Sequence, residues 1–317
     1  MRFQTAAIMG AGAVGSYIYW GLEEKLGDDL WVIGQGERAE RLRREGLIIN
    51  GQQYKPCVRT PREAHGVDLL IVSLKYTGLN EDSLREIGEI VDDHTTIISV
   101  MNGINSEEII GGYVGYDHML YSIIKISAQR TSNQVTFPLP SERMGIFYGE
   151  KEHRDGYTER ELALREFFEG TMLISHLSDH ILVDIWSKFS LNISNNLPQA
   201  IVGCGAGAYL DSPYLADVAD HLRQEVAAVA AARGIHLDSS YGKTVKGDKV
   251  LKVARYSTLQ DLDHGRRTEI EAFSGTLIRE GLKLGVPTPF NQVIYDLIKT
   301  IEEKQAGKFD YNPDEMF

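Results

Sequence analysis

The chain has 317 residues, of which 43% are hydrophobic and 25% charged, and a formal net charge of −12 at pH 7. This length favours two domains, and the composition is that of an ordinary globular protein. The acidic balance argues against non-specific nucleic-acid binding, and no run approaches the roughly 18 apolar residues of a membrane span. Two cysteines form no disulfide framework and no signal peptide is evident, so we expect a cytoplasmic protein.

The first half of the sequence alternates between apolar runs and helical patterns. Apolar runs predict strands at residues 5–9, 30–34, 68–74 and 95–100. Helical patterns lie between and after them, at residues 13–25, 37–45 and 80–91. Asn50-Gly51 predicts a hairpin within residues 46–57. Strands that alternate with helices indicate a parallel, doubly wound sheet.

The pattern changes twice further along the chain. Residues 118–150 favour additional strands, partly antiparallel, and they precede a helix at 158–170 and a last strand within 172–177. After residue 179 the strand signal nearly vanishes. Helical spacing then recurs at residues 180–196, 214–233, 267–284 and 291–304. We therefore expect an α/β domain over residues 1–179 and an all-helical domain over residues 180–317.

The sequence Gly10-Ala11-Gly12-Ala13-Val14-Gly15 joins the first predicted strand to the first predicted helix. In that context the pattern is typical of a Rossmann-type dinucleotide-binding unit. Gly10 allows a tight turn, Gly12 leaves room for a pyrophosphate, and Gly15 lets the helix approach the strand. The helix N-terminus offers unpaired N–H groups to the phosphates. The alternative is a glycine turn that binds nothing.

The end of the second predicted strand bears on which dinucleotide is bound. NAD-binding folds usually place a carboxylate there, but this chain has Gln35-Gly36. Gln35 can form hydrogen bonds, and Arg38 or Arg41 could meet a 2′-phosphate, which favours NADP. The two arginines could instead belong to the solvated face of a polar helix, and Glu37 keeps NAD open.

Lys188, Asn192 and Asn196 share one face of a predicted helix that is otherwise largely apolar. Polar groups on a buried helix need partners or a ligand. A lysine in apolar surroundings releases its proton more easily than one in water, which suits it to proton transfer. The alternative is an exposed stripe with a solvated lysine.

Four other positions are candidates because of their surroundings. Lys75 and Asn102 follow the third and fourth predicted strands, where ligands bind in open α/β sheets. Both could instead be ordinary loop residues. Glu269 lies at the predicted start of a helix, where an acid is favourable in any case. Ser257 could be a simple helix cap.

Taken together, these residues resemble the 2-dehydropantoate 2-reductase (ketopantoate reductase) family. The matches occur in order: the glycine motif, Leu74-Lys75, Asn102-Gly103, Lys188-x3-Asn192-x3-Asn196 and Ser257-x11-Glu269. The resemblance implies a C-terminal domain like that of 6-phosphogluconate dehydrogenase, with the active site in a cleft between the domains. It also implies NADPH-dependent reduction of 2-dehydropantoate to (R)-pantoate, in pantothenate and coenzyme A biosynthesis.

The resemblance also implies roles for individual residues. Lys188 would donate the proton to the carbonyl oxygen, and Glu269 would hold the hydroxyl side of the substrate and orient Lys188. Asn192, Asn196 and Ser257 would bind the substrate. Cofactor contacts would come from the glycine motif and from Lys75, Asn102 and Ala128, in addition to Gln35 and Arg38, which the end of the second predicted strand suggests. No metal is implied, and a homodimer is possible.

Three departures from the family pattern concern substrate identity. The end of the second predicted strand has Gln35-Gly36 where a clear NADP-binding member is expected to have an arginine. A substrate-contacting asparagine of some members has no counterpart in Cys204-Gly205-Ala206-Gly207, and Pro198 stands where many members lack a proline. Two alternatives therefore remain open. One is an NAD(P)H-dependent reductase of another 2-oxo acid, and the other is a non-catalytic NADP(H)-sensing module.

Overall fold

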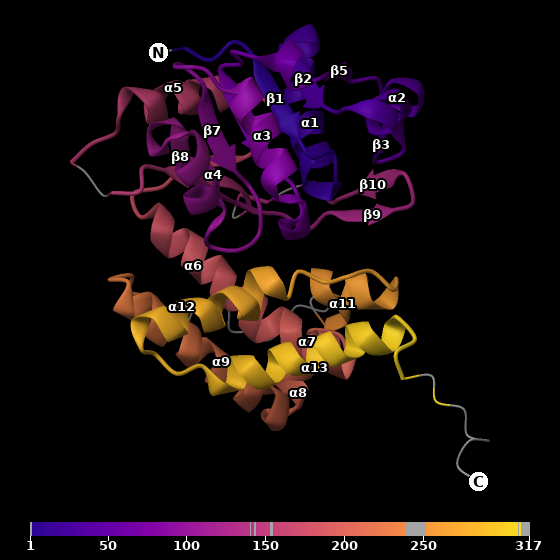
Figure 1. Cartoon of the computed structure of the whole chain (residues 1–317), viewed down its shortest axis with the longest axis vertical. Coiled ribbons are helices and arrows are strands. Elements are labelled where there is room, and N and C mark those ends of the chain that lie inside the picture. Colours follow the sequence, from indigo (N-terminus) through magenta and orange to yellow (C-terminus); the bar gives the residue numbers. More distant parts are fainter. Residues whose placement is uncertain are drawn as a thin grey trace. The chain divides into compact units, whose positions relative to one another are not determined.

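The computed structural model describes residues 2–139, 141–142, 144–152, 155–238, 252–309 and 311. It divides into two compact units, Met1–Ile185 and Trp186–Phe317, each with its own buried apolar clusters (Figure 1). Within the described residues, no helix is long and apolar enough to cross a membrane.

The N-terminal unit is built on an eight-stranded sheet. In spatial order its strands are β12 (Ser175–Leu177), β11 (Gly145–Gly149), β8 (Met119–Lys125), β7 (Thr96–Ser99), β6 (Leu69–Val72), β1 (Ala6–Met9), β2 (Leu30–Ile33) and β5 (Cys57–Arg59). All neighbouring strands run parallel except β8 and β11. The chain passes from β1 to β2 on one side and later to β6 on the other. The carboxyl ends of β1 and β6 therefore meet where the strand order reverses, which is where such sheets bind ligands.

Helices cover both faces of this sheet, which explains why its strands are apolar throughout. Ala6 and Ile8 pack into one core with α1 (Ala13–Leu26) and α5 (Glu159–Phe168). Ala7 and Met9 point the other way and pack with α3 (Glu81–Ile90) and α4 (Ser106–Val114). Helices α3 and α4 lie on the same face of the sheet (Figure 1). The sheet holds the turn after β1 between two well-packed layers.

A second, smaller sheet was not predicted. Its strands lie in the order β4 (Gln52–Tyr54), β3 (Leu47–Ile49), β10 (Gln134–Thr136) and β9 (Gln129–Thr131). Strands β3 and β4 form the predicted hairpin, and Asn50 (φ 48°) and Gly51 (φ 82°) both have the left-handed backbone that its two-residue turn requires. Strand β10 runs parallel to β3, which follows helix α2 (Gly36–Glu45). This pairing brings the β9–β10 hairpin close to α2.

In the C-terminal unit, all the regular elements among the described residues are helices. After α6 (Ile181–Leu191) come the π-helical turn η5 (Asn192–Asn196), α7 (Leu197–Val202), α8 (Ala208–Asp211), α9 (Pro213–Ala232), α11 (Ser257–Asp263), the π-helical turn η6 (Glu271–Gly275), α12 (Thr276–Leu284) and α13 (Pro289–Gln305). Helix α9 packs against η5, α12 and α13 (Figure 1).

The buried carboxylate of Glu225 links α9 to α13 through hydrogen bonds. Glu225 of α9 accepts hydrogen bonds from the backbone N–H groups of Phe290 and Asn291 at 2.8 and 2.9 Å. These N–H groups belong to the first turn of α13, where a helix has unpaired donors and favours a negative charge.

The predicted fold class is confirmed, but two helix boundaries are wrong. The helix predicted over residues 180–196 continues through η5 and α7 to Val202. The sequence pattern placed a helix over residues 267–284, whereas the helical path begins at Glu271. Thr268 accounts for the difference, because its backbone N–H and its Oγ1 both donate to Glu302 Oε1 at 2.7 Å. Glu269 therefore lies in a bend that precedes the helix.

Candidate active site

The glycine turn is held tightly by the end of β6. Ser73 Oγ donates a hydrogen bond to the carbonyl oxygen of Gly10 at 2.5 Å, and Gly10 has φ +111°. A Cβ on Gly10 would lie 2.6 Å from the carbonyl oxygen of Ser73. A Cβ on Gly15 would lie 1.9 Å from the carbonyl oxygen of Gly10. These two glycines are therefore required by the packing of the turn itself.

Gly12 differs from both, because a Cβ there would meet no atom within 4 Å. Packing does not require glycine at this position, so the open space is available to a ligand. Gly12 is also the N-cap of α1, which has no side-chain cap and no acid in its first turn. Room beside the backbone and an uncompensated helix N-terminus together fit a dinucleotide pyrophosphate.

Helix α2, which follows β2, lies beside a cavity of about 540 Å³ that Ala11, Arg38 and Arg41 help to line. Gln35 caps α2 and donates its amide N–H to Glu86 at 3.0 Å. The structure thus brings Arg38, but not Gln35, to the cavity. A third guanidinium, from Arg130 of β9, also lines it, and the sequence did not single out this residue.

Lys75 and Asn102 lie in the loops after two neighbouring strands of the large sheet. Strand β6 ends at Val72 and β7 at Ser99, so both residues are three positions beyond a carboxyl strand end. Lys75 is exposed and Asn102 half-buried. Ala128 is half-buried in the connection between β8 and β9.

In the C-terminal unit, Lys188, Asn192 and Asn196 are more buried than residues on a solvated helix face would be. Asn192 and Asn196 are 6% and 4% exposed, and Lys188 is half-buried. Asn196 Nδ2 donates to Asn192 Oδ1 at 3.3 Å, so these amides face each other. Among the described residues, the buried Oδ1 of Asn196 has no hydrogen-bond partner. Such an atom costs free energy unless a ligand supplies a donor.

Pro198 explains why the helix widens into a π-helical turn at these asparagines. Proline has no N–H and clashes with the carbonyl of the residue four positions earlier in a regular helix. The turn η5 precedes Pro198 directly and absorbs the mismatch. Tyr209 secures the altered backbone: its hydroxyl donates to the carbonyl oxygen of Asn195 and accepts from the N–H of Gln199.

Ser257 is the first residue of α11 and is not its cap, which is Tyr256. The chain before it is clamped by Gln199, which is fully buried. The amide of Gln199 donates to the carbonyl oxygen of Ala254 at 2.9 Å and accepts from the N–H of Tyr256 at 2.7 Å. The sequence did not predict this role for Gln199.

The helices bring the polar positions of this unit together. The turn η5, with Asn192 and Asn196, contacts both α11, which begins at Ser257, and η6, which follows Glu269. Glu269 is 9% exposed. The bonds from Thr268 to Glu302 hold the bend in which Glu269 lies.

The glycine-rich segment after α7 has a packing role. A Cβ on Gly205 would lie 2.3 Å from the carbonyl oxygen of Lys252, and Ala206 donates its N–H to Ala254 at 3.0 Å. The segment therefore lies flat against the chain that leads to Ser257, and a larger side chain at Gly205 would displace that chain.

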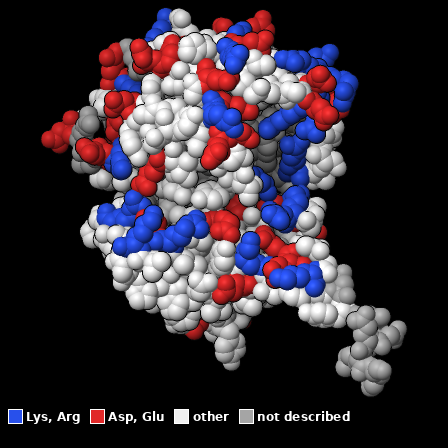
Figure 2. Space-filling view, viewed as in Figure 1, with Lys and Arg blue, Asp and Glu red and all other residues white. Residues whose placement is uncertain are grey.

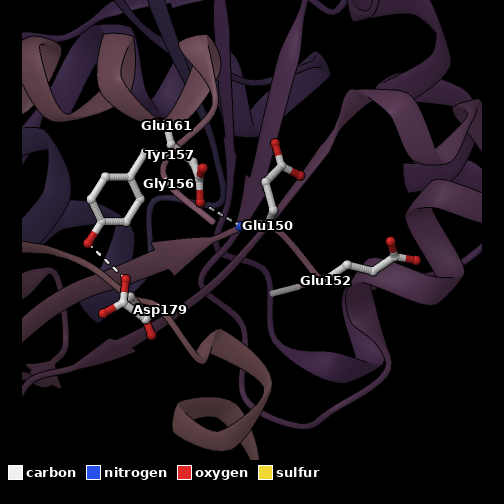
Figure 3. A pocket seen from close by; sticks show the side chains of 7 residues that line it. Glu150, Glu152, Gly156, Tyr157, Glu161 and Asp179 are labelled. Carbon is white, nitrogen blue, oxygen red and sulfur yellow. Dashed lines mark hydrogen bonds between the residues drawn. The ribbon is translucent and has the colours of Figure 1, made fainter. Parts of the chain in front are cut away.

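An acidic hollow in the N-terminal unit is not a candidate for the site (Figure 3). Its volume is about 20 Å³, far below that of a dinucleotide. Two of its carboxylates also have partners: Glu161 accepts from the N–H of Glu150 at 2.9 Å, and Asp179 accepts from the Tyr157 hydroxyl at 2.8 Å. Among the described residues, no cluster of side chains could hold a metal ion.

Known proteins match both units. Residues 6–142 match the family model "Ketopantoate reductase PanE/ApbA", and residues 180–302 match "Ketopantoate reductase PanE/ApbA C terminal". The chain belongs to the ketopantoate reductase family. Membership makes it an oxidoreductase with a nicotinamide dinucleotide cofactor.

Individual members of the ketopantoate reductase family are similar over nearly their whole length. The 2-dehydropantoate 2-reductase of Archaeoglobus fulgidus is 27% identical, over 95% of this chain and 99% of its own. That of Pyrococcus horikoshii is also 27% identical, over 95% and 98%. A solved complex of D-mandelate dehydrogenase with NADH is 25% identical, with a TM-score of 0.83 over 95% of this chain and 99% of its own.

Proposed function

We propose that this chain reduces 2-dehydropantoate to (R)-pantoate with NADPH, and that Lys188 Nζ donates the proton. The observation that carries the proposal is the buried amide pair, Asn192 and Asn196, which lie about one and two turns beyond Lys188. The unpartnered Oδ1 of Asn196 needs a hydrogen-bond donor, and the substrate hydroxyl is one. The curated relatives named 2-dehydropantoate 2-reductase support the same substrate.

The chemistry divides between the cofactor and the side chains. When bound, the reduced nicotinamide supplies a hydride to the keto carbon. Negative charge then grows on the carbonyl oxygen, and the Lys188 ammonium stabilises this charge and transfers its proton to the oxygen. Glu269 orients Lys188 and accepts a hydrogen bond from the substrate. Asn192, Asn196 and Ser257 bind the polar groups of the keto acid and fix its orientation.

We propose that the dinucleotide binds at the turn Gly10-Ala11-Gly12-Ala13-Val14-Gly15, with further contacts from Lys75, Asn102 and Ala128. The open space at Gly12 and the uncapped start of α1 support the position of the pyrophosphate. Arg38 of α2, which helps to line the cavity of about 540 Å³, supports a phosphorylated ribose and thus NADPH. We assign this dinucleotide domain to residues 1–179, because β12 ends at Leu177 and α6 begins at Ile181.

The test is oxidation of NADPH at 340 nm by the purified protein with 2-dehydropantoate, beside NADH and a panel of other 2-oxo acids. We expect turnover that depends on 2-dehydropantoate and prefers NADPH. Turnover of a different 2-oxo acid alone would contradict the substrate assignment. NADPH binding without turnover of any 2-oxo acid would contradict the assignment as a reductase.

A second candidate is a reductase of a different 2-oxo acid. The similarity to D-mandelate dehydrogenase favours it, because that enzyme acts on another 2-hydroxy acid within the same fold. The flat segment at Gly205 and Gly207 also favours it, since it offers no polar side chain to a substrate. The panel of 2-oxo acids separates the two candidates.

We also propose a homodimer formed through an apolar face of the C-terminal unit. Val218 of α9 and Phe290, Val293 and Leu297 of α13 are all exposed, Val293 by 57%. His221 of α9 stacks on Phe290 with ring centroids 4.3 Å apart, so the two helices present one continuous face. Light scattering on the purified protein should give twice the chain mass, and Val293→Asp with Leu297→Asp should give the mass of one chain.

A further inference from the structure

Three arginines gather on one cavity of the N-terminal unit. Arg38 and Arg41 come from α2, and Arg130 comes from β9, almost ninety residues later in the chain. Figure 2 shows lysine and arginine side chains concentrated over α2 and the β9–β10 hairpin, on a chain whose net charge is −12. Such a local concentration of positive charge attracts an anionic ligand despite the acidic whole.

The three guanidiniums are not neutralised by neighbours. Within the part of the chain that the structure describes, no carboxylate lies within salt-bridge distance of Arg38, Arg41 or Arg130. Glu45 lines the same cavity, but its carboxylate pairs with Arg44 at 2.7 Å. Among the described residues, the cavity is therefore lined by three guanidiniums and by one carboxylate, which pairs with an arginine outside the lining.

Arg130 is held in place by backbone oxygens. Its Nη1 donates to the carbonyl oxygen of Ala11 at 3.2 Å, and its Nε donates to that of Ser132 at 3.2 Å. Arg130 lies opposite Val135 in the β9–β10 pair, and Val135 is 2% exposed. Residues opposite each other in an antiparallel pair point to the same side, so the packing of Val135 fixes the side on which Arg130 emerges.

The guanidinium of Arg130 is crowded by other positive charges, and this crowding affects its pKa. Burial of the guanidinium lowers the pKa of Arg130, and the nearby charges of Arg41 and Arg38 lower it further. An anion in the cavity would relieve this repulsion. Arginine is also the side chain best matched to phosphate, because its planar N–H groups form paired hydrogen bonds with phosphate oxygens.

We infer that Arg130 completes, with Arg38 and Arg41, a site for a phosphate monoester, and that Arg130 determines the preference for a dinucleotide phosphorylated on its ribose. The bond from Arg130 to Ala11 ties this site to the glycine turn, so the phosphate belongs to the ligand whose pyrophosphate that turn binds. The inference rests on the proposed function only in assigning the phosphate to the cofactor.

Calorimetric binding of 2′,5′-ADP and 5′-AMP tests this inference without any keto acid. We expect wild type to bind 2′,5′-ADP at least about 10-fold more tightly than 5′-AMP. Arg130→Met should weaken 2′,5′-ADP binding at least about 10-fold and leave 5′-AMP binding unchanged. In turnover, the same variant should lower the ratio of kcat/KM for NADPH to that for NADH. Arg62→Met, which removes an exposed guanidinium that lies outside the cavity and pairs with Glu89 at 3.6 Å, is the matched control and should change neither the ratio of the two nucleotide affinities nor the ratio of the two kcat/KM values.

Three results would overturn the inference. The first is an Arg130→Met variant, folded by circular dichroism, that binds 2′,5′-ADP as well as wild type does. The second is an equal loss of affinity for both nucleotides, and the third is displacement of 2′,5′-ADP by an equal concentration of inorganic phosphate. A protein that reduces no 2-oxo acid but shows the expected nucleotide preference would refute the proposed function and leave this inference intact.

Discussion

The side-chain carbonyl of Gln199 accepts a hydrogen bond from the backbone N–H of Tyr256 at 2.7 Å. The same amide donates to the carbonyl oxygen of Ala254 at 2.9 Å, so one buried side chain serves two backbone groups. These groups lie immediately before Ser257. The position of Ser257 therefore depends on a residue in a different helix, 58 positions earlier in the chain.

Gln199→Met should separate this positioning role from general stability. Methionine fills similar volume but leaves two backbone groups without partners, so we expect the free energy of unfolding to fall by about 2–4 kcal/mol. The KM for the keto acid should rise while the Kd for NADPH stays unchanged. Urea unfolding and steady-state kinetics measure the two effects. Gln292→Met, at an exposed glutamine of α13, is the control, and equal behaviour of the two variants would contradict the assignment.

Lys188→Ala should abolish proton donation without disturbing the dinucleotide. We expect kcat to fall by about 10²- to 10⁴-fold, the usual contribution of a general acid, with little change in NADPH affinity measured by fluorescence. Lys283→Ala, at an exposed lysine of α12, controls for loss of positive charge in the same unit. Activity of Lys188→Ala equal to that of wild type would refute the assignment of Lys188.

Two glycines of one motif should respond differently to the same substitution. Gly12 has φ −81° and open space, so Gly12→Ala should unfold like wild type but bind NADPH more weakly. Gly15→Ala places a methyl group 1.9 Å from the Gly10 carbonyl oxygen and should cost about 1–3 kcal/mol of stability or more. Thermal unfolding and NADPH titration of both variants make the comparison. A clear loss of stability in Gly12→Ala would show that packing also requires this glycine.

Glu107 should make stability depend on pH. Burial raises its pKa to about 7, although hydrogen bonds such as that from Ser106 Oγ at 2.7 Å oppose the shift. Between pH 4.5, its ordinary pKa, and about 7, the folded protein binds more protons at this site than the unfolded chain does. Its contribution to the free energy of unfolding therefore falls as pH rises through this window, by about 3 kcal/mol in all, and is constant above it.

Glu107→Gln removes this titration and keeps the size of the side chain. The variant's stability relative to wild type should rise from pH 5 to pH 7 and level off by pH 8. Urea unfolding at pH 5, 6, 7 and 8 measures that difference, in which the titration of all other groups cancels. If the difference in free energy of unfolding between the variant and wild type does not change with pH, the pKa of Glu107 is not raised in the folded protein.

The large sheet and the glycine turn could be predicted because local sequence encodes them. A strand such as Ala6–Met9, apolar on both faces, needs cover on both sides, and a turn as tight as that at Gly10 needs glycine. The helix boundary near Glu269 could not be predicted in this way. Thr268 leaves the helical path because of Glu302, which lies 34 residues later.

The features that the sequence did not reveal depend on long-range pairing. Strands β9 and β10 have three residues each, and β10 is placed by β3, which lies more than eighty residues earlier. Arg130 could therefore not be assigned to the cavity beside Arg38 before that pairing was known. The hydrogen bonds of Gln199 to the backbone of Ala254 and Tyr256 could not be predicted either, because these residues lie more than fifty positions later in the chain. Glutamine in a helix also usually faces solvent.

The π-helical turn also changes which residues of the stripe line up. In a regular α-helix four residues overshoot a full turn by about 40°, so a side chain eight positions beyond Lys188 would be rotated by about 80° from it. A π-helical turn holds more residues and so rotates less at each one, which cancels part of this drift over residues 192–196. A change that restores ordinary α-helical winding at unchanged length, as Pro198→Ala should favour, would swing Asn196 out of phase with Lys188, even though every side chain of the stripe would still be present.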